Sequence, residues 1–232
     1  MTVESRTISV IVPTYNEERT ISALLESLRQ LSPEEIIVVD GASADRTVEI
    51  AARSARVILS ERGRGIQMNA GARASSGSVL LFLHADVRLA PGSFQAIKER
   101  MDDQDIIGGN FDVRFEGDDW AASAFTHVNR WRRKLGVFYG DSGIFCRRQV
   151  FEKLGGYRPW PLLEDYDFAR RLQRAGRLAM LDEPIWVSNR RWRHSGLFRT
   201  LWIWFWIQVL YCAGVRPERL AAWYQADRFR FR

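Results

Sequence analysis

Short apolar runs alternate with helix-like segments over the first hundred residues, and this alternation restricts the folds open to the chain. Apolar runs of strand length lie at 8–12, 36–40, 57–59 and 79–83. The segments predicted to be helical are 20–31, 45–54 with Ser43 as a candidate cap, a stretch through Met68 and Ala72, and 91–101 with Pro91 in its first turn. Strands separated by helical crossovers build a mostly parallel, doubly wound (Rossmann-like) sheet. The chain is therefore predicted to be an α/β protein.

The pattern changes after residue 101, where longer elements replace the regular alternation. We predict strands at 106–115 and 142–147 and helices at 121–135 and 164–175. A length of 232 residues is ample for one domain with a substantial core. The prediction is one domain over 1–195, made of two halves at 7–100 and 101–195, with a helical appendage at 196–232.

The appendage contains an uncharged, Trp-rich run between Arg199 and Arg216. Its sixteen residues, 200–215, extend about 24 Å as a helix, short of the ~30 Å hydrocarbon core of a bilayer. Tryptophan flanked by arginine is typical of helices at the membrane interface, and three Trp within 202–206 favour that reading. Packing on the chain's own domain, or on a second copy in a homodimer, explains the same composition, so both interpretations stay open here.

The positive net charge of the chain favours anionic partners. The formal charge is +6 and the pI is about 9.7, which favours nucleotides, nucleic acid or an acidic membrane face. The basic residues accompany no nucleic-acid-binding motif, so nucleic acid is disfavoured. Two cysteines, Cys146 and Cys212, give neither a disulfide framework nor a zinc site. The first residues lack a signal-peptide pattern, which predicts a cytoplasmic protein. The Trp-rich run adds the expectation that it lies peripherally on the inner face of the cell membrane.

Carboxylates follow the apolar runs. The run at 81–83 continues into His84, Ala85 and Asp86, and the run at 36–39 ends at Asp40. In open α/β sheets ligands bind at the carboxyl ends of the strands. A carboxylate oxygen there suits Mg²⁺ or Mn²⁺ holding a diphosphate.

A Gly-rich segment follows the third predicted strand. Arg62-Gly63-Arg64-Gly65 offers guanidinium groups for phosphate and glycines for close backbone approach. A dinucleotide-binding fingerprint is excluded, because Met68 replaces its third glycine and the segment follows the third strand rather than the first.

Four segments, taken in order, resemble the landmarks of family 2 glycosyltransferases with the GT-A fold, over roughly residues 7–194. They are Pro13-Thr14-Tyr15-Asn16-Glu17, Val39-Asp40-Gly41-Ala42-Ser43, His84-Ala85-Asp86 and Leu163-Glu164-Asp165. The resemblance is strongest to small bacterial members with a His-Ala-Asp motif and a Trp-rich tail. It implies an inverting glycosyltransferase of the hexosyltransferase type, which moves a sugar from a UDP- or GDP-linked donor to a hydroxyl acceptor with Mg²⁺ or Mn²⁺. Residues 7–100 are then the nucleotide half and 101–195 the acceptor half.

The resemblance assigns roles residue by residue. It places Asp86 on the metal, with His194 as a further metal contact. It makes Asp165 the general base, which takes the proton of the acceptor hydroxyl. Glu164 is expected either to orient Asp165 or to contact the acceptor. Acceptor contacts are expected from Asp141, Trp160 and Trp192. Nucleotide contacts are expected from Pro13, Tyr15, Asn16, Glu17, Asp40, Arg64, Gly65, Asn69, His84, Ala85 and Arg191.

The chain departs from the family pattern at two places. His84 stands where the Asp-x-Asp motif has its first Asp, and Ser188 stands where processive synthases have the Gln of Gln-x-x-Arg-Trp. The second departure disfavours processive polymerisation. A lipid or membrane-bound glycan is a plausible acceptor only through the Trp-rich run.

Two other functions remain open from the sequence. A nucleotidyltransferase usually has a Gly-rich basic loop after its first strand, where this chain has Pro-Thr-Tyr-Asn-Glu. A non-catalytic, membrane-associated nucleotide-sugar-binding module is the other alternative, and the presence of Asp40, Asp86 and Asp165 argues against it.

Overall fold

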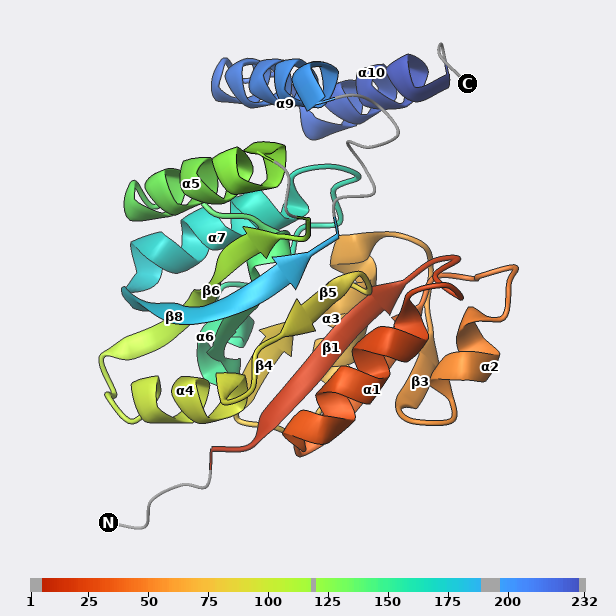
Figure 1. Cartoon of the computed structure of the whole chain (residues 1–232), viewed down its shortest axis with the longest axis vertical. Coiled ribbons are helices and arrows are strands. Elements are labelled where there is room, and N and C mark those ends of the chain that lie inside the picture. The colour runs from red at the N-terminus through yellow and green to blue at the C-terminus, as the bar shows by residue number, and fades with distance from the viewer. Residues whose placement is uncertain (1–5, 118–119, 189–196, 230–232) are drawn as a thin grey trace.

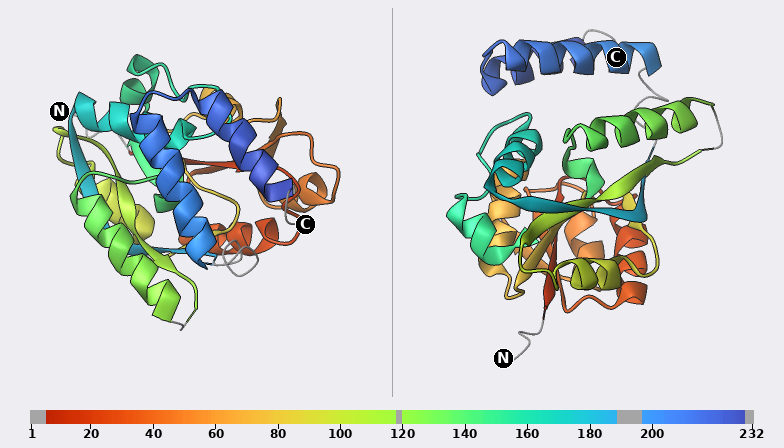
Figure 2. Two further views of the ribbon diagram at one scale, coloured as in Figure 1. Left: turned by 90° about the horizontal axis from the view of Figure 1, so that it is seen from above. Right: turned by 90° about the vertical axis from the view of Figure 1, so that its left-hand side faces the viewer.

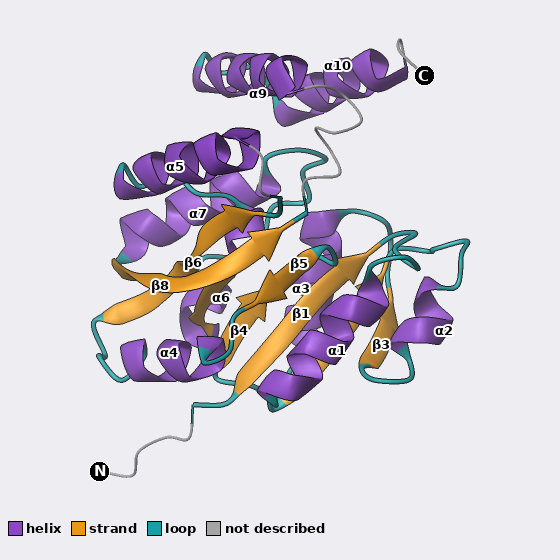
Figure 3. Ribbon diagram, in the orientation of Figure 1, coloured by secondary structure: helices purple, strands orange, loops and turns teal. Residues whose placement is uncertain are grey.

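The computed structural model describes residues 6–117, 120–188 and 197–229, which form a layered α/β domain with two further helices at its C-terminal end (Figures 1 and 3). The sheet has eight strands in the order β3-β2-β1-β4-β7-β6-β8-β5. The strands are β1 (Ile8–Thr14), β2 (Glu35–Asp40), β3 (Arg56–Leu59), β4 (Val79–Phe82), β5 (Val87–Leu89), β6 (Ile106–Phe115), β7 (Ile144–Arg147) and β8 (Arg177–Val187). The predicted α/β class and mostly parallel sheet are confirmed.

The first four strands form the parallel part, as predicted. β1 pairs in parallel with both β2 and β4, and β2 pairs in parallel with β3. Because Thr14 lies opposite Asp40 in this register, β1 and β2 end side by side. The crossovers are α1 (Ile21–Leu31), α2 (Thr47–Ala51) and α3 (Arg64–Ala74). The carboxyl ends of these strands therefore meet at one edge, where ligands bind in such sheets.

The second part of the sheet is mixed. β7 is antiparallel to both β4 and β6, whereas β6 is parallel to β8. Its helices are α4 (Ser93–Arg100), α5 (Trp120–Lys134), α6 (Arg148–Lys153) and α7 (Glu164–Ala175), with a 3₁₀ turn η1 (Gly140–Ser142) before β7. The sequence prediction missed β5, β8 and α6. β8 carries charges and Pro184 and pairs with β6 through register shifts, so it lacks a regular apolar alternation.

The two faces of the sheet are covered by separate apolar clusters. α1 and α4 pack on one face through residues such as Leu24, Leu28 and Ile97. α3, α6 and α7 pack on the other through residues such as Met68 and Phe168. This arrangement explains why the central strands read as continuous apolar runs, since both of their faces are buried.

Three predicted elements are present, but their boundaries or capping residue differ from the prediction. α2 is shorter than the predicted 45–54, and Ser43 bonds to Asp40 instead of capping this helix. α4 begins after Gly92, whose left-handed backbone (φ 83°) separates Pro91 from the helix. The predicted strand 142–147 begins only at Ile144, because η1 occupies Gly140–Ser142.

Two helices, α9 (Leu197–Cys212) and α10 (Pro217–Phe229), form a separate layer above α5 and α7 (Figures 1 and 2). Their inner side joins the domain in an apolar cluster that includes Leu163, Tyr166, Ile207 and Leu220. The outer side of α9 leaves large apolar side chains exposed, among them Trp202 (63%) and Phe205 (57%). Within the described residues, no helix has both the length and the apolar character needed to cross a bilayer.

Candidate active site

Three distant parts of the chain meet at Gly140. A side-chain carbon built on Gly140 would lie 2.9 Å from His84 Nε2 and 3.0 Å from Asp165 Oδ2. Glycine leaves this space open, so the end of β4, the turn η1 and the start of α7 approach one another at this point. The structure thus brings together two of the predicted site residues, His84 and Asp165, which are 81 positions apart in the sequence.

Asp165 is held at the N-terminus of α7. Its Oδ2 accepts a hydrogen bond from Gly140 N at 2.8 Å, and its Oδ1 accepts one from Tyr166 N at 2.7 Å. Leu163 precedes the helix with a left-handed backbone (φ 63°). The carboxylate is only 7% exposed, and the helix N-terminus favours its negative charge. Backbone donors therefore fix both carboxylate oxygens in position.

Glu164 is more deeply buried, at 1% exposure. Its Oε1 lies 2.7 Å from Arg64 Nε, so α3 and α7 are joined by an ion pair. Burial raises the pKa of Glu164 to about 7; the neighbouring charge of Asp165 adds to the rise and Arg64 opposes it. Arg64, predicted as a nucleotide contact, thus faces the Glu-Asp motif.

The residues predicted to contact the nucleotide lie largely in the loops after β1 and β2, which hydrogen-bond to each other. Asp40 is 1% exposed and accepts hydrogen bonds from Thr14 Oγ1 at 3.1 Å and Ser43 N at 2.8 Å. Asn16, with φ 54°, donates its backbone N–H to Ser43 Oγ and accepts from Ala44 N. The loops after β1 and β2 consequently support each other, and Asp40 is tied into its own loop.

The remaining predicted contacts on this edge lie close by. Pro13 lies within β1 opposite Val39, Ala85 is buried beside His84, and the backbone N–H of Glu17 donates to Thr47 Oγ1. Tyr15 is partly exposed, and the Arg62 guanidinium carbon lies 3.8 Å from its ring centroid. This stack places a cation and an aromatic face at the rim of the site.

Gly65 and Asn69 have protein neighbours in the structure. A side chain at Gly65 would collide with the carbonyl oxygen of Arg158. The Asn69 side chain exchanges two hydrogen bonds, both 2.8 Å, with the backbone of Tyr157. Both residues therefore hold the segment before α7 against α3.

Sequence reasoning missed Gln67, a buried residue of α3 whose side chain bonds to the ends of two strands. Its Nε2 donates to Thr14 O at 2.7 Å and to Val39 O at 2.8 Å, so α3 binds the ends of β1 and β2 directly. The sequence does contain a hint of this role. Gln67 lies four positions before Gly71 and so shares its helix face, and Gly71 packs closely on Ile11 of β1.

Asp86 lies at the carboxyl end of β4, where its main-chain oxygen accepts a hydrogen bond from Ser188 N at 3.3 Å. The side chain offers one hard oxygen donor at the ligand-binding edge. Among the described residues, no group of three or more His, Cys, Asp or Glu side chains is arranged to hold a metal. A single carboxylate fits a Mg²⁺- or Mn²⁺-type ion whose other ligands are substrate phosphates and water.

The predicted acceptor residues Asp141 and Trp160 lie in different parts of the structure. Asp141 lies in η1, directly after Gly140. Trp160 contacts the appendage, with its ring centroid 6.3 Å from that of Tyr211 in α9. Three predicted residues, Arg191, Trp192 and His194, lie outside the described residues.

A sequence model described as Glycosyl transferase family 2 matches residues 9–155. An uncharacterized glycosyltransferase of Haemophilus influenzae is 31% identical over 185 residues, covering 71% of this chain and 61% of that protein. A PGL/p-HBAD biosynthesis glycosyltransferase of Mycobacterium bovis is 31% identical over 175 residues, covering 69% and 67%. The chain spans between 52% and 66% of the length of the first three curated relatives it matches.

Solved structures share the fold. S. aureus TarS superposes with a TM-score of 0.64 at 19% identity, covering 78% of this chain and 36% of TarS. Glucosyl-3-phosphoglycerate synthase from Mycobacterium tuberculosis, solved with Mn²⁺, UDP and glucosyl-3-phosphoglycerate, superposes with a TM-score of 0.59 at 22% identity, covering 78% and 71%. These likenesses identify the architecture as that of GT-A glycosyltransferases.

Proposed function

Because this chain belongs to glycosyl transferase family 2, we propose that it transfers a sugar from a UDP- or GDP-linked donor to a hydroxyl acceptor, with inversion at the anomeric carbon. In this proposal residues 7–100 hold the nucleotide, residues 101–195 hold the acceptor, and residues 196–232 form the appendage. The observation that carries it is the meeting of His84, Gly140 and Asp165 at one point. A carboxylate fixed beside the ligand edge of the sheet suits proton abstraction.

The chemistry needs one base and one leaving group. The acceptor hydroxyl oxygen attacks the anomeric carbon and forms the new C–O bond while its proton passes to Asp165. The bond from the anomeric carbon to the diphosphate oxygen breaks, and its electron pair leaves with the nucleoside diphosphate. The hydrogen bonds from Gly140 N and Tyr166 N keep the carboxylate aimed during the attack.

Asp86 is the residue proposed to hold the divalent cation. A bound Mg²⁺ or Mn²⁺ would supply Lewis acidity at the leaving diphosphate. We expect UDP or GDP with Mn²⁺ to raise the melting temperature of the wild type. At one hundred times the dissociation constant a ligand stabilises a fold by about 2.7 kcal/mol, and Asp86→Ala loses the metal-dependent part of this gain. Equal metal-dependent gains in both proteins would remove Asp86 from the role.

The base is tested by Asp165→Asn. We expect turnover to fall by about 10²–10⁴-fold while nucleotide binding changes little, because the amide keeps the shape but accepts no proton. Asp167→Asn is the matched control, since Asp167 lies in the same helix and pairs with Arg171 at 2.8 Å. If Asp165→Asn keeps more than about a third of wild-type turnover, with chemistry limiting the rate, Asp165 is not the base.

The appendage is proposed to dock on the inner face of the membrane, with a lipid or membrane-bound glycan as acceptor. Support comes from the exposed side chains on the outer side of α9, including Trp202, Phe205 and Trp206. Indole rings favour the headgroup region, and Arg199, Arg216 and Arg219 add attraction to anionic lipid.

Sedimentation with anionic vesicles tests this docking. The wild type should sediment and be partly released by salt. Replacing Trp202 and Phe205 by Ala should weaken binding by roughly tenfold per side chain. Trp131→Ala is the matched control, because Trp131 is equally exposed (64%) but lies on α5. A wild type that ignores the vesicles would contradict the docking without affecting the assignment of Asp165.

A further inference from the structure

The inner side of α9 packs on the segment that carries the Glu-Asp pair. Two residues that flank this pair in the sequence, Leu163 and Tyr166, are buried in one apolar cluster with Ile207 of α9. The outer side of α9 is the one proposed to meet the membrane, so the inner contact has a separate role. Because packed protein interiors transmit displacements, a helix that packs here influences where Asp165 lies.

A pair of stacked tyrosine rings joins the two segments that hold Asp165. The backbone N–H of Gly140, the residue directly after Tyr139, donates to Asp165 Oδ2 at 2.8 Å. The backbone N–H of Tyr166 donates to Asp165 Oδ1 at 2.7 Å. The rings of Tyr139 and Tyr166 stack on each other, with centroids 5.3 Å apart and planes inclined by 27°. This tyrosine stack therefore sets the spacing between the two backbone donors of the carboxylate.

α9 contacts both rings of the tyrosine stack. Tyr139 Oη donates to Gln208 Oε1 at 2.7 Å. The Tyr211 ring meets the Tyr166 ring edge-on, with centroids 5.8 Å apart, which is a favoured geometry for aromatic pairs. Gln208 and Tyr211 are three positions apart, so they share one face of the helix. One face of α9 thus supports both segments that bind Asp165.

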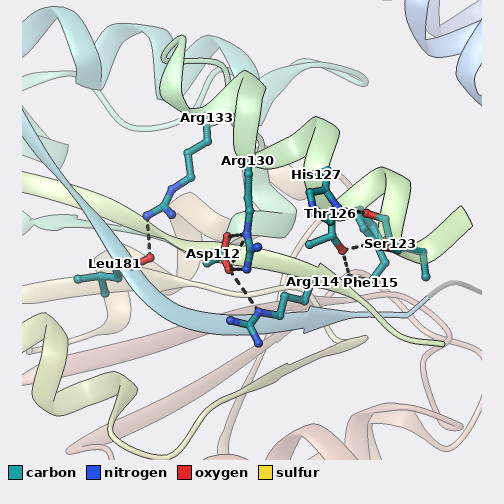
Figure 4. Close-up of polar contacts among 10 residues, drawn as sticks. Asp112, Arg114, Phe115, Ser123, Thr126, His127, Arg130, Arg133 and Leu181 are labelled. Atoms are coloured by element: carbon teal, nitrogen blue, oxygen red, sulfur yellow. Dashed lines mark hydrogen bonds and ion pairs between the residues drawn. The ribbon is translucent and has the colours of Figure 1, made fainter. Parts of the chain in front are cut away.

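A second support of the tyrosine stack comes from α5. Arg132 donates to Tyr139 Oη, and its guanidinium carbon lies 4.9 Å from the centroid of the Tyr139 ring. α5 is itself tied to the sheet, because Arg130 binds Asp112 of β6 through Nε and Nη2, at 2.9 and 2.5 Å (Figure 4). Tyr139 is therefore held by a helix fixed on the sheet and by a helix of the appendage.

We propose that α9 positions the base: Tyr211 and Gln208 hold the tyrosine stack, and the stack keeps its two backbone N–H donors aimed at Asp165. The inference rests on the proposed function, in which Asp165 takes the proton. Tyr211 and Gln208 act through the stack and are positioning residues. A misplacement of about 1 Å at a reacting centre can cost about 10²-fold in rate, so loosening this face of α9 slows the reaction while the donor still binds.

Amide hydrogen exchange in the full-length protein tests the position of the two donors. Tyr211→Ala removes the ring that contacts Tyr166. We expect the amides of Gly140 and Tyr166 to exchange roughly fivefold faster, while the amides of β1 and β4 keep their wild-type rates, because only local hydrogen bonds weaken. An equal rise in β1 and β4 would show general destabilisation and would contradict the proposal.

Donor hydrolysis tests the effect on the reaction, with UDP-N-acetylglucosamine or GDP-mannose and Mn²⁺. Water replaces the acceptor: its oxygen bonds to the anomeric carbon, its proton passes to Asp165, and the nucleoside diphosphate leaves. We expect Tyr211→Ala to lower kcat about tenfold and to change KM for the donor by less than about twofold. Tyr211→Phe keeps the ring and should retain the wild-type kcat.

Trp204→Ala is the matched control. Trp204 is also half-buried on α9, but its ring contacts Tyr224 of α10, with centroids 5.9 Å apart. This variant should lower the melting temperature and leave kcat and the exchange of both donor amides near the wild-type values. If Tyr211→Ala fails to fold, Tyr211→Leu replaces it, because leucine keeps apolar volume but lacks the flat ring.

Wild-type exchange or wild-type kcat in Tyr211→Ala, or equal changes in Trp204→Ala, overturns the proposal. Failure of the proposed function is recognised separately, because the wild type then hydrolyses neither donor and neither UDP nor GDP with Mn²⁺ raises its melting temperature. In that case the exchange of the Gly140 and Tyr166 amides still decides whether α9 holds the two donors.

Discussion

The two halves of the domain treat their buried polar groups differently. In residues 7–100, Asp40 and Gln67 bond to the protein itself and lock the ends of β1 and β2. In residues 101–195, Asn110 Nδ2 and Tyr157 Oη lie buried without a hydrogen-bond partner among the described residues. In the first half these bonds hold the carboxyl ends of β1 and β2 in place. The second half thus leaves two buried polar atoms without a partner among the described residues, which is uncommon in folded proteins and carries an energetic cost.

Among the effects expected from this comparison, the largest lies where the two halves meet, at Gly140. Gly140→Ala inserts a carbon 2.9 Å from His84 Nε2 and 3.0 Å from Asp165 Oδ2, so these groups must separate. A misplacement of about 1 Å at a reacting centre can cost about 10²-fold in rate, and we expect a loss of that order in glycosyl transfer.

Gly155→Ala is the control for this substitution. Gly155 has φ 73° and no neighbouring atom within 4 Å of a side-chain carbon, so its substitution strains the backbone without touching the site. It should lower the melting temperature but leave turnover near the wild-type value. A Gly140→Ala protein with at least half of wild-type turnover would show that the contact does not control the geometry.

The first half is tested through Gln67. Gln67→Leu leaves the carbonyls of Thr14 and Val39 without their side-chain donor, which should cost about 2–3 kcal/mol in the free energy of unfolding. Urea denaturation measures this loss. Gln95→Leu is the control, because Gln95 is exposed on α4 and, among the described residues, its side chain bonds to Glu99 alone. It should change stability by less than about 0.5 kcal/mol. Equal losses would contradict this role of Gln67.

The parallel and the mixed parts of the sheet also differ in how well the sequence predicts them. The parallel part was predicted nearly strand by strand, because strands buried on both faces give apolar runs and α1 shows a clear buried stripe at Ile21, Leu24 and Leu28. β8 was missed because its exposed and buried residues follow no strict alternation. β5, with three residues, is too short to show a period.

The candidate site was predictable only in part. Carboxylates at strand ends and helix starts pointed to Asp40, Asp86 and Asp165, and the family resemblance added their roles. The contact of Asp165 with Gly140 depends on how α7 packs beside η1, which no local pattern reveals.

The stability of the folded protein should depend on pH through Glu164, which pairs with Arg64 across the two halves. The pKa of Glu164 is raised to about 7, chiefly by burial, above the ordinary value of a glutamate. Between about pH 4.5 and 7 the folded protein therefore binds more protons than the unfolded chain, so stability falls as the pH rises through this range. We expect the melting temperature to fall between about pH 4.5 and 7, because each kcal/mol of lost stability lowers it by about 2–4 °C in a domain of this size.

Glu164→Gln isolates this contribution. The amide stays neutral at every pH, so the variant should lose most of the decrease between about pH 4.5 and 7. Glu26→Gln, at an exposed position of α1, should keep the wild-type profile. An unchanged slope in Glu164→Gln would show that another group is responsible.

The smallest expected effect concerns how residues 101–195 hold the appendage. Tyr139 Oη donates to Gln208 Oε1 in α9 at 2.7 Å and accepts a hydrogen bond from Arg132, while its ring stacks on Tyr166. Tyr139→Phe keeps the ring and removes the polar link, at a cost of about 1 kcal/mol. If α9 opens as a local unit, its backbone amides should exchange with solvent roughly fivefold faster, while the global melting temperature stays nearly constant.

Tyr211→Phe serves as the control, because the Tyr211 ring contacts Trp160 and Tyr166 but its hydroxyl bonds to none of the described residues. Exchange that rises equally in both variants, or in neither, would mean that apolar packing alone attaches α9, and that the appendage moves with the domain as one body.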